Sequence, residues 1–113
     1  MFDIEVQSQR GPYGVTIASG QLAAGFRGDF GLIDQNLSHL GPWRADHLEL
    51  LEATENRKNL ATASTVLTQM SRAGLGKNSL AFAVGGGTTQ DVATLAFSLY
   101  MRGLNWTFVP TSL

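Results

Sequence analysis

Hydrophobic and polar residues alternate at the start of the chain in the pattern of a β-hairpin. Phe2, Ile4 and Val6 alternate with polar residues, and the alternation resumes beyond the turn residues Arg10-Gly11-Pro12. Period-two alternation on both sides of a turn predicts two antiparallel strands. We interpret the glycine-containing stretch 20–28 that follows as a connection with one helical turn.

Short apolar runs later in the chain are typical of buried strands. Such runs occupy residues 30–33, 79–84 and 106–109. Their length and the turn residues around them fit strands of a parallel sheet, which are buried on both faces. Between residues 37 and 52 the pattern is ambiguous, because Gly41-Pro42 interrupts any helix, and we expect a short strand there.

Two segments have the periodicity of amphipathic helices. In the first, apolar residues recur on one side from Leu60 to Met70, and Gly74 marks its end. The second is expected from about Thr89, with these apolar residues on its buried side: Val92, Leu95, Ala96 and Leu99. The alternation of helices with apolar strands predicts an α/β fold, a Rossmann-like, mainly parallel sheet with flanking helices behind an N-terminal β-hairpin.

The composition limits the possible partners. With 113 residues, 43% of them hydrophobic and 15% charged, the chain is expected to fold as one domain over residues 1–113. A net charge of −1 without a basic cluster gives no reason to expect nucleic acid as a partner. No cysteine is present, and the longest apolar stretch, residues 80–84, is far too short to cross a bilayer. We therefore expect a cytoplasmic protein without a membrane partner.

Residues 84–91 carry the most informative motif, Val-Gly-Gly-Gly-Thr-Thr-Gln-Asp. Glycines between a strand and a helix permit positive φ, and they leave the backbone N–H groups and the positive end of the helix open to an anion such as pyrophosphate. The motif differs from the usual dinucleotide fingerprint, because Gln90 occupies the third glycine position. On these residues alone, a tight turn without any ligand is an equal alternative.

Three charged residues have simple structural interpretations. Asp91 is expected in the first turn of the second helix, where the helix dipole favours a carboxylate. Glu55 and Lys58 lie three residues apart and can form a surface ion pair. His39 and His47 lack the carboxylate spacing of a metal triad, so we expect no metal site.

Four motifs follow one another in order: Glu55-Asn56-Arg57-Lys58, Gly85-Gly86-Gly87-Thr88-Thr89-Gln90-Asp91, Arg102-Gly103 and Val109-Pro110-Thr111-Ser112-Leu113. Together they resemble the N-terminal, cofactor-binding half of the 3-dehydroquinate synthases and related sugar phosphate cyclases. In that family a Glu-x-x-Lys motif precedes a helix, and a Gly-Gly-Gly-x-x-x-Asp turn follows a strand. The next helix ends in Arg-Gly, and a strand then runs into Pro-Thr-Thr-Leu. The resemblance covers residues 56–113 and implies a domain that binds NAD.

The resemblance also implies which residues surround the cofactor. Asp34 would reach its adenosine end, and Glu55 and Lys58 would contact the NAD. The pyrophosphate and nicotinamide side would be lined by Gly86, Gly87, Thr88, Thr89 and Asp91, with Thr111 and Ser112 completing the wall. All of these positions follow predicted strands, at the carboxyl edge where such sheets bind ligands.

The chain departs from the family pattern in several places. Ser112 replaces the second threonine, and Gln90 stands where glycine is common. The interval between Asp34 and Glu55 looks too short for the helix and strand that members place there. Full-length members continue into further lysines and a helical domain whose Glu and two His bind a divalent metal. We therefore expect a fragment, a split subunit or a truncated member, with metal only where a separate C-terminal chain supplies it.

The resemblance implies the NAD-binding portion of a 3-dehydroquinate synthase-like enzyme, a lyase of the shikimate pathway. Its reaction is the phosphate-eliminating cyclisation of a seven-carbon sugar acid phosphate, which this chain is not expected to catalyse alone. Two alternatives stay open: a non-catalytic nucleotide-binding or assembly module, and a fragment of a related polyol dehydrogenase. We also expect a homodimer, formed through an exposed apolar face or through an edge strand such as residues 2–6.

Overall fold

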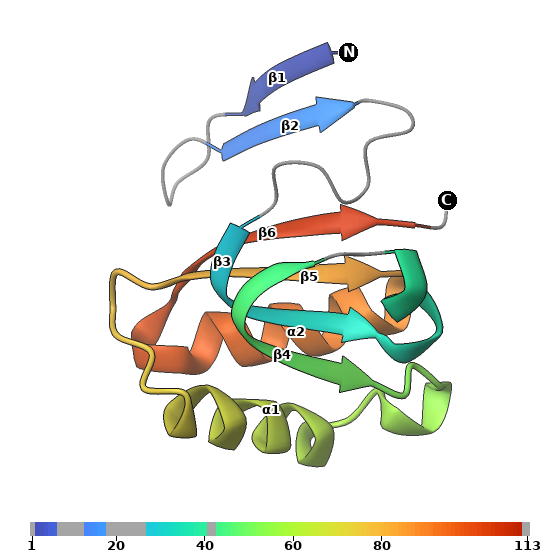
Figure 1. Ribbon diagram of the computed structural model, residues 1–113, viewed down its shortest axis with the longest axis vertical. Coiled ribbons are helices and arrows are strands. Elements are labelled where there is room, and N and C mark those ends of the chain that lie inside the picture. The colour runs from blue at the N-terminus through green and yellow to red at the C-terminus, as the bar shows by residue number, and fades with distance from the viewer. Residues whose placement is uncertain (1, 7–12, 18–26, 41–42, 112–113) are drawn as a thin grey trace.

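A computed structural model of the chain describes residues 2–6, 13–17, 27–40 and 43–111. Its centre is a four-stranded parallel sheet in the order β4-β3-β5-β6 (Figure 1). These strands are β3 (Arg27–Asp34), β4 (Arg44–Leu51), β5 (Leu80–Gly85) and β6 (Asn105–Pro110). The first two strands, β1 (Phe2–Val6) and β2 (Tyr13–Ile17), pair antiparallel in a sheet of their own, which confirms the predicted hairpin.

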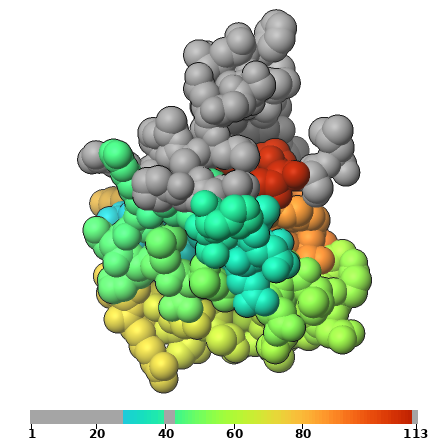
Figure 2. Space-filling model, turned by 45° about the vertical axis from the view of Figure 1, so that its right-hand side comes forward, coloured from blue at the N-terminus to red at the C-terminus, as the bar shows by residue number. Residues whose placement is uncertain are grey.

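Two α-helices and three short 3-10 helices connect the strands. The α-helices are α1 (Leu60–Arg72) and α2 (Gly87–Leu99), and the 3-10 helices are η1 (Gln35–Leu40), η2 (Glu55–Arg57) and η3 (Tyr100–Arg102). Both α-helices pack on one face of the sheet (Figure 1). Figure 2 shows the segments from η1 through α1, coloured cyan-green to yellow, at the molecular surface. The alternation of parallel strands and helices confirms the α/β, Rossmann-like prediction.

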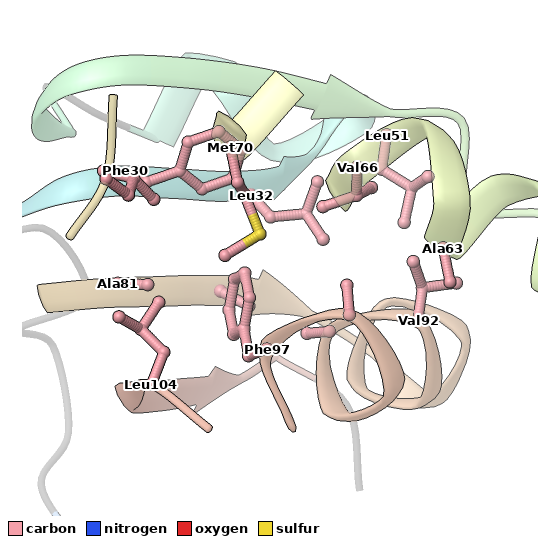
Figure 3. Packing of buried hydrophobic residues seen from close by; sticks show 14 residues of the cluster. Phe30, Leu32, Leu51, Ala63, Val66, Met70, Ala81, Val92, Phe97 and Leu104 are labelled. Atoms are coloured by element: carbon pink, nitrogen blue, oxygen red, sulfur yellow. The ribbon is translucent and has the colours of Figure 1, made fainter. Parts of the chain in front are cut away.

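Aromatic rings fill the main core between the sheet and the two α-helices. Phe97 of α2 is fully buried and meets Phe30 edge-to-face, with ring centroids 6.3 Å apart. Its other neighbour is Trp106 of β6, at 5.2 Å and an interplanar angle of 70°. Figure 3 shows Phe30, Met70 and Phe97 pointing into the space between the sheet and the helices. Such pairs add to the stabilisation that the buried area provides.

A smaller cluster occupies the opposite face of the sheet, where Ile33, Phe82 and Val84 are buried. Phe82 lies over the glycines of β3: a Cβ atom at Gly31 would be 2.6 Å from its Cζ atom. Gly31 is therefore required because the ring of the neighbouring strand occupies the space of a side chain.

Several predicted boundaries and faces need correction. The expected short strand between residues 37 and 52 is an eight-residue strand, β4, preceded by the 3-10 helix η1. The interval after Asp34 therefore does accommodate a strand, because a tight 3-10 helix needs fewer residues than an α-helical crossover. The first helix ends as predicted, with Gly74 at φ 77°. Residues 20–26 of the expected connection lie outside the described residues, and residues 27 and 28 already belong to β3.

The second α-helix begins at Gly87, two residues before the predicted start, and turns a different face to the core. Val92 and Ala96 are buried as predicted, but Leu95 and Leu99 are exposed. The small residues Ala93 and Ala96 let the helix approach the sheet closely, and Phe97 fills the remaining volume. Helical periodicity alone does not distinguish the large leucines from the small alanines beside them.

We predict that Phe97→Ala destabilises the fold by about 3–5 kcal/mol, the usual cost of truncating a buried aromatic residue. The matched control, Leu99→Ala, removes a side chain that is 54% exposed on the same helix and should change stability by only about 0.5 kcal/mol. Urea denaturation followed by circular dichroism gives both values. Similar losses for the two variants would contradict the packing described for α2.

Candidate functional site

The sheet reverses its strand order between β3 and β5. From β3 the chain passes to β4 on one side, whereas β5 leads to β6 on the other side. In open α/β sheets, ligands bind at the carboxyl ends of the strands at such a reversal. Asp34 is the last residue of β3 and Gly85 the last of β5, and the preceding residues, Ile33 and Val84, are paired in the ladder. The candidate site is therefore this edge of the sheet.

The N-terminus of α2 lies at this edge, and no side chain of the described residues caps it. Gly86 is the N-cap residue, and its carbonyl oxygen accepts a hydrogen bond from the Gln90 N–H at 3.0 Å. Helix α1 differs, because the side chain of Asn59 accepts a hydrogen bond from the Thr62 N–H at 2.8 Å. The first N–H groups of an α-helix have no partner within the helix. Those of α2, from Gly87 onward, are therefore available to an anion, which the helix dipole also favours.

The glycine loop, residues 85–87, is not built on positive φ. Gly86 has φ −98° and ψ −156°, and the glycines with positive φ among the described residues lie elsewhere. Gly85 is needed for another reason: a Cβ atom there would lie 2.6 Å from Cβ of Thr89. The expectation of positive φ was therefore wrong. Gly85 is required because the first turn of α2 packs directly against it.

Thr89 is the buried polar residue of this site. Its side chain is fully buried against Gly85, and its Oγ1 atom has no hydrogen-bond partner in the described part of the chain. Leaving a buried hydroxyl unpaired costs free energy. Its neighbour Thr88 is half-buried and Gly87 is exposed, so the outer side of the loop is open to solvent.

Lys58 connects the Glu-x-x-Lys motif to α2. Its Nζ atom lies 2.9 Å from a carboxylate oxygen of Asp91 and 3.8 Å from one of Glu55. The hydrogen bond and charge of Asp91, followed by the charge of Glu55, raise the pKa of Lys58 above its ordinary value of 10.5. Asp91 lies beyond the first turn of α2, so its expected position in that turn is wrong, and its partner is Lys58.

Asp34 and Thr111 lie on either side of the glycine loop's strand. The Oδ1 atom of Asp34 accepts a hydrogen bond from the Asn36 N–H at 3.0 Å, which fixes the carboxylate at the start of η1. The Thr111 N–H donates to the Gly85 carbonyl oxygen at 2.9 Å and so holds the end of β6 beside the loop. Ser112 lies outside the described residues.

The structure thus brings most of the predicted site residues to one edge of the sheet. The strand end at Gly85 contacts Thr89 and Thr111, and Lys58 joins the Glu-x-x-Lys motif to Asp91. The unpaired hydroxyl of Thr89 could not be predicted from the sequence, because burial of a threonine in the first turn of a helix depends on tertiary packing.

A groove of about 540 Å³ was also missed. It lies between α1 and the end of β4, and its lining includes Gln35, Asn56, Thr62, Thr65 and Gln69. These residues look like ordinary solvent-facing positions in the sequence. The glycine loop does not line this groove, and we place the anion site at the loop because free N–H groups are found there.

Neither a metal site nor a membrane span is found in the described part of the chain. Among residues 2–6, 13–17, 27–40 and 43–111, no three His, Asp or Glu side chains gather as metal ligands. None of the helices in these segments has the length and apolar character needed to cross a membrane.

Comparison with known proteins identifies the relatives of this chain. The family model of the 3-dehydroquinate synthase N-terminal domain matches residues 49–113. A 3-dehydroquinate synthase of Pelobacter propionicus is 41% identical over 66 residues, which are 58% of this chain and 18% of that protein. The enzyme of the same name from Dichelobacter nodosus is 41% identical over 59 residues, which are 52% of this chain and 16% of that enzyme. The chain spans less than a fifth of the length of these relatives.

Two solved structures are similar in fold. One is a 2-epi-5-epi-valiolone synthase from Streptomyces hygroscopicus with NAD+ and Zn2+ bound, which has a TM-score of 0.66 and is 26% identical in sequence. The match covers 76% of this chain and 27% of the synthase chain. The other is a 2-deoxy-scyllo-inosose synthase complexed with carbaglucose-6-phosphate, NAD+ and Co2+, with a TM-score of 0.74. At 18% identity, the second shows the fold alone; it covers 98% of this chain and 35% of its own.

We predict that two glycine substitutions in the same loop have opposite effects on stability. Gly85→Ala should cost about 1–3 kcal/mol, because the new methyl group overlaps Thr89. Gly87→Ala should be neutral or stabilise by up to about 1 kcal/mol, because a Cβ atom there meets nothing within 4 Å. Thermal unfolding of both variants measures the difference, and equal effects would show that Thr89 is not the cause.

We predict that Asp91→Asn lowers the pKa of Lys58 toward 10.5, because the variant removes the largest cause of the raised value. NMR titration of the lysine side chain measures this, and Glu55→Gln should produce a smaller fall in the same direction. A pKa raised in the folded state stabilises the fold at and below the ordinary pKa, and that contribution disappears as the pH rises through the folded-state pKa. The stability difference between wild type and Asp91→Asn should therefore be present at neutral pH and vanish in strong alkali.

Proposed function

The chain belongs to the 3-dehydroquinate synthase family, whose N-terminal domain model covers more than half of it, and from this we propose that it is the NAD-binding portion of a 3-dehydroquinate synthase-like enzyme. The observation that carries the proposal is the uncapped N-terminus of α2 at the strand-order reversal, beside a glycine loop and a buried, unpaired hydroxyl. These features suit a pyrophosphate group, which needs backbone donors, positive potential and close approach.

The residues of this edge have distinct roles in the proposal. The backbone N–H groups of Gly87 and Thr88 hold the pyrophosphate, and Gly86 permits its close approach. The Thr89 hydroxyl, which lacks a partner in the described structure, donates to a ligand oxygen or to a water molecule that bridges to one. Asp34 lies on the neighbouring strand, where it can accept a hydrogen bond from a ribose hydroxyl at the adenosine end.

Lys58 prepares the site electrostatically. Asp91 lies on α2 close to the anion site, and an isolated carboxylate there would repel phosphate. The ion pair at 2.9 Å places the positive charge of Lys58 beside that carboxylate. A carboxylate oxygen of Glu55 lies 3.8 Å from the same ammonium group. Thr111, with Ser112 after it, forms the wall at the end of β6.

When bound, NAD supplies reversible hydride acceptance, and the protein supplies its binding and orientation. The proposed reaction is the phosphate-eliminating cyclisation of a seven-carbon sugar acid phosphate, a lyase step of the shikimate pathway in the cytoplasm. The described residues do not fit a divalent metal, so the proposal takes no step through one. We propose that residues 1–113 act as one NAD-binding domain that completes its site with a metal-binding segment, either from a longer chain or from a separate one.

We predict that the purified chain binds NAD and that Gly86→Val weakens binding at least about tenfold, because a β-branched side chain blocks approach to the loop. The backbone of Gly86 is extended, with φ −98°, so the variant does not force valine into a left-handed conformation. Isothermal calorimetry measures binding, and thermal unfolding checks the fold.

The matched control is Gly76→Val, at an exposed position where an added Cβ meets nothing within 4 Å. It should bind NAD like the wild type. Equal affinity of the Gly86 and Gly76 variants, or no NAD binding by the wild-type chain, would contradict the proposal.

A further inference from the structure

Asn59 joins the turn η2 to helix α1 through both its backbone and its side-chain amide. Its backbone N–H donates to the Arg57 carbonyl oxygen at 2.9 Å, and its carbonyl oxygen accepts a hydrogen bond from the Ala63 N–H at 3.2 Å. Its Nδ2 atom donates to the Asn56 carbonyl oxygen at 2.7 Å, and its Oδ1 atom accepts from the Thr62 N–H at 2.8 Å. The residue therefore holds the turn on one side and the first turn of the helix on the other.

The two side-chain hydrogen bonds of Asn59 serve different elements. An N-cap residue needs one acceptor for an N–H group of the first helical turn, and serine or aspartate supplies it as well as asparagine does. An amide places a donor and an acceptor on two separate atoms, so it can bond to two elements at once. At Asn59 the acceptor caps α1, whereas the donor goes back to Asn56 in the turn. The donor is not part of the helix cap, so its effect is on η2.

The first turn of α1 is itself fixed against α2. Ala63 of α1 and Val92 of α2 are both buried in the main core cluster, and Figure 3 shows their side chains in the region where the two helices meet. Val92 follows Asp91 directly in the sequence. The Thr62 N–H that Asn59 binds therefore belongs to a helical turn whose place relative to Asp91 is set by packing.

Lys58 lies directly before Asn59, between the turn and the helix. Its backbone N–H donates to the Glu55 carbonyl oxygen at 3.1 Å, and its Nζ atom lies 2.9 Å from the Asp91 carboxylate. A long, partly exposed side chain loses conformational entropy when one contact holds it. A backbone that is already fixed beside the partner lowers this cost, since fewer arrangements of the chain are then lost on contact.

We propose that Asn59 is a positioning residue of the anion site, which ties η2 to α1 so that Lys58 meets Asp91 close to the glycine loop. Asn59 acts through Lys58, which carries the charge. The benefit of this positioning for NAD rests on the proposed function, whereas its effect on the contact between Lys58 and Asp91 does not.

Asn59→Ser separates the helix cap from the bond to the turn. Serine still caps α1, so the midpoint of thermal unfolding should fall by no more than about 3 °C. Because the amide donor is lost, the pKa of Lys58, measured by NMR titration, should fall toward 10.5. Adding Asp91→Asn should then lower it further by less than about half of the fall that this change causes in the wild type. An unchanged pKa of Lys58 in Asn59→Ser would overturn the proposal.

A second variant tests the same bond with a side chain of the original length. Asn59→Asp keeps the acceptor that caps α1 and lacks the donor to Asn56. The added charge changes the pKa of Lys58 directly, so the quantity compared is the further change that Asp91→Asn causes. This change should again be smaller than in the wild type, and an undiminished change would count against the proposal.

The matched control is Asn56→Ser, the same exchange at an exposed side chain three residues earlier. It retains the backbone carbonyl group that Asn59 binds. The pKa of Lys58 should therefore stay at its wild-type value. An equal fall in both serine variants would show that any exchange in the turn has this effect and that Asn59 has no particular role.

Calorimetry with NAD tests the consequence for the cofactor. Asn59→Ser should weaken NAD binding about threefold, which is within the range expected for an exposed ion pair. A lowered pKa of Lys58 with unchanged NAD affinity would refute a role for Asn59 at the cofactor site. A wild-type chain that does not bind NAD would contradict the proposed function, and the pKa of Lys58 would still decide whether Asn59 positions that residue.

Discussion

Strand β5 is buried on both faces, and the rest of the structure depends on how its two faces are packed. Residues 81–85 are all buried, with small side chains toward the α-helices and large ones toward the opposite face. Ala81 and Ala83 leave room for Phe97 and Phe30. On the other face, Phe82 fills the space left free by Gly31 of β3. Each large side chain thus lies beside a small residue of a neighbouring element, which keeps the interior close-packed.

Because β5 is fixed in this way, the start of α2 is fixed too. Only the three-glycine loop, residues 85–87, separates the buried strand from the helix, and Thr89 rests against Gly85. Phe97 anchors the far end of α2 through its contacts with two aromatic rings. The N–H groups of the first helical turn are therefore held by packed elements rather than by a long mobile loop. Such support keeps a binding site in position before its ligand arrives.

Features encoded in local sequence were predictable, and those that depend on distant contacts were not. The apolar run before three glycines identifies β5 and the start of α2, because a short buried strand followed by a tight turn into a helix produces this pattern. The strand β4 was harder to predict, since Gly41-Pro42 interrupts its approach and Leu48 and Leu50 are exposed. Asp91 has its partner thirty-three positions away at Lys58, and no local pattern reveals such a pairing. The resemblance indicated that both residues belong to the site, but the structure shows that they contact each other.

In the proposed function, the contact between Lys58 and Asp91 links two motifs that lie far apart in the sequence. A carboxylate near the start of α2 opposes the binding of phosphate, whereas the helix dipole and the free N–H groups favour it. Lys58 compensates Asp91 at 2.9 Å while remaining within 3.8 Å of Glu55, so the turn η2 delivers one positive charge between two negative ones. All three side chains are at least 41% exposed, and solvent screening therefore limits what the pairs contribute to stability. In the proposed function their effect is therefore on the ligand: the ammonium group of Lys58, 2.9 Å from Asp91, offsets the repulsion between that carboxylate and an incoming anion, while Glu55 on the same turn partly cancels this gain.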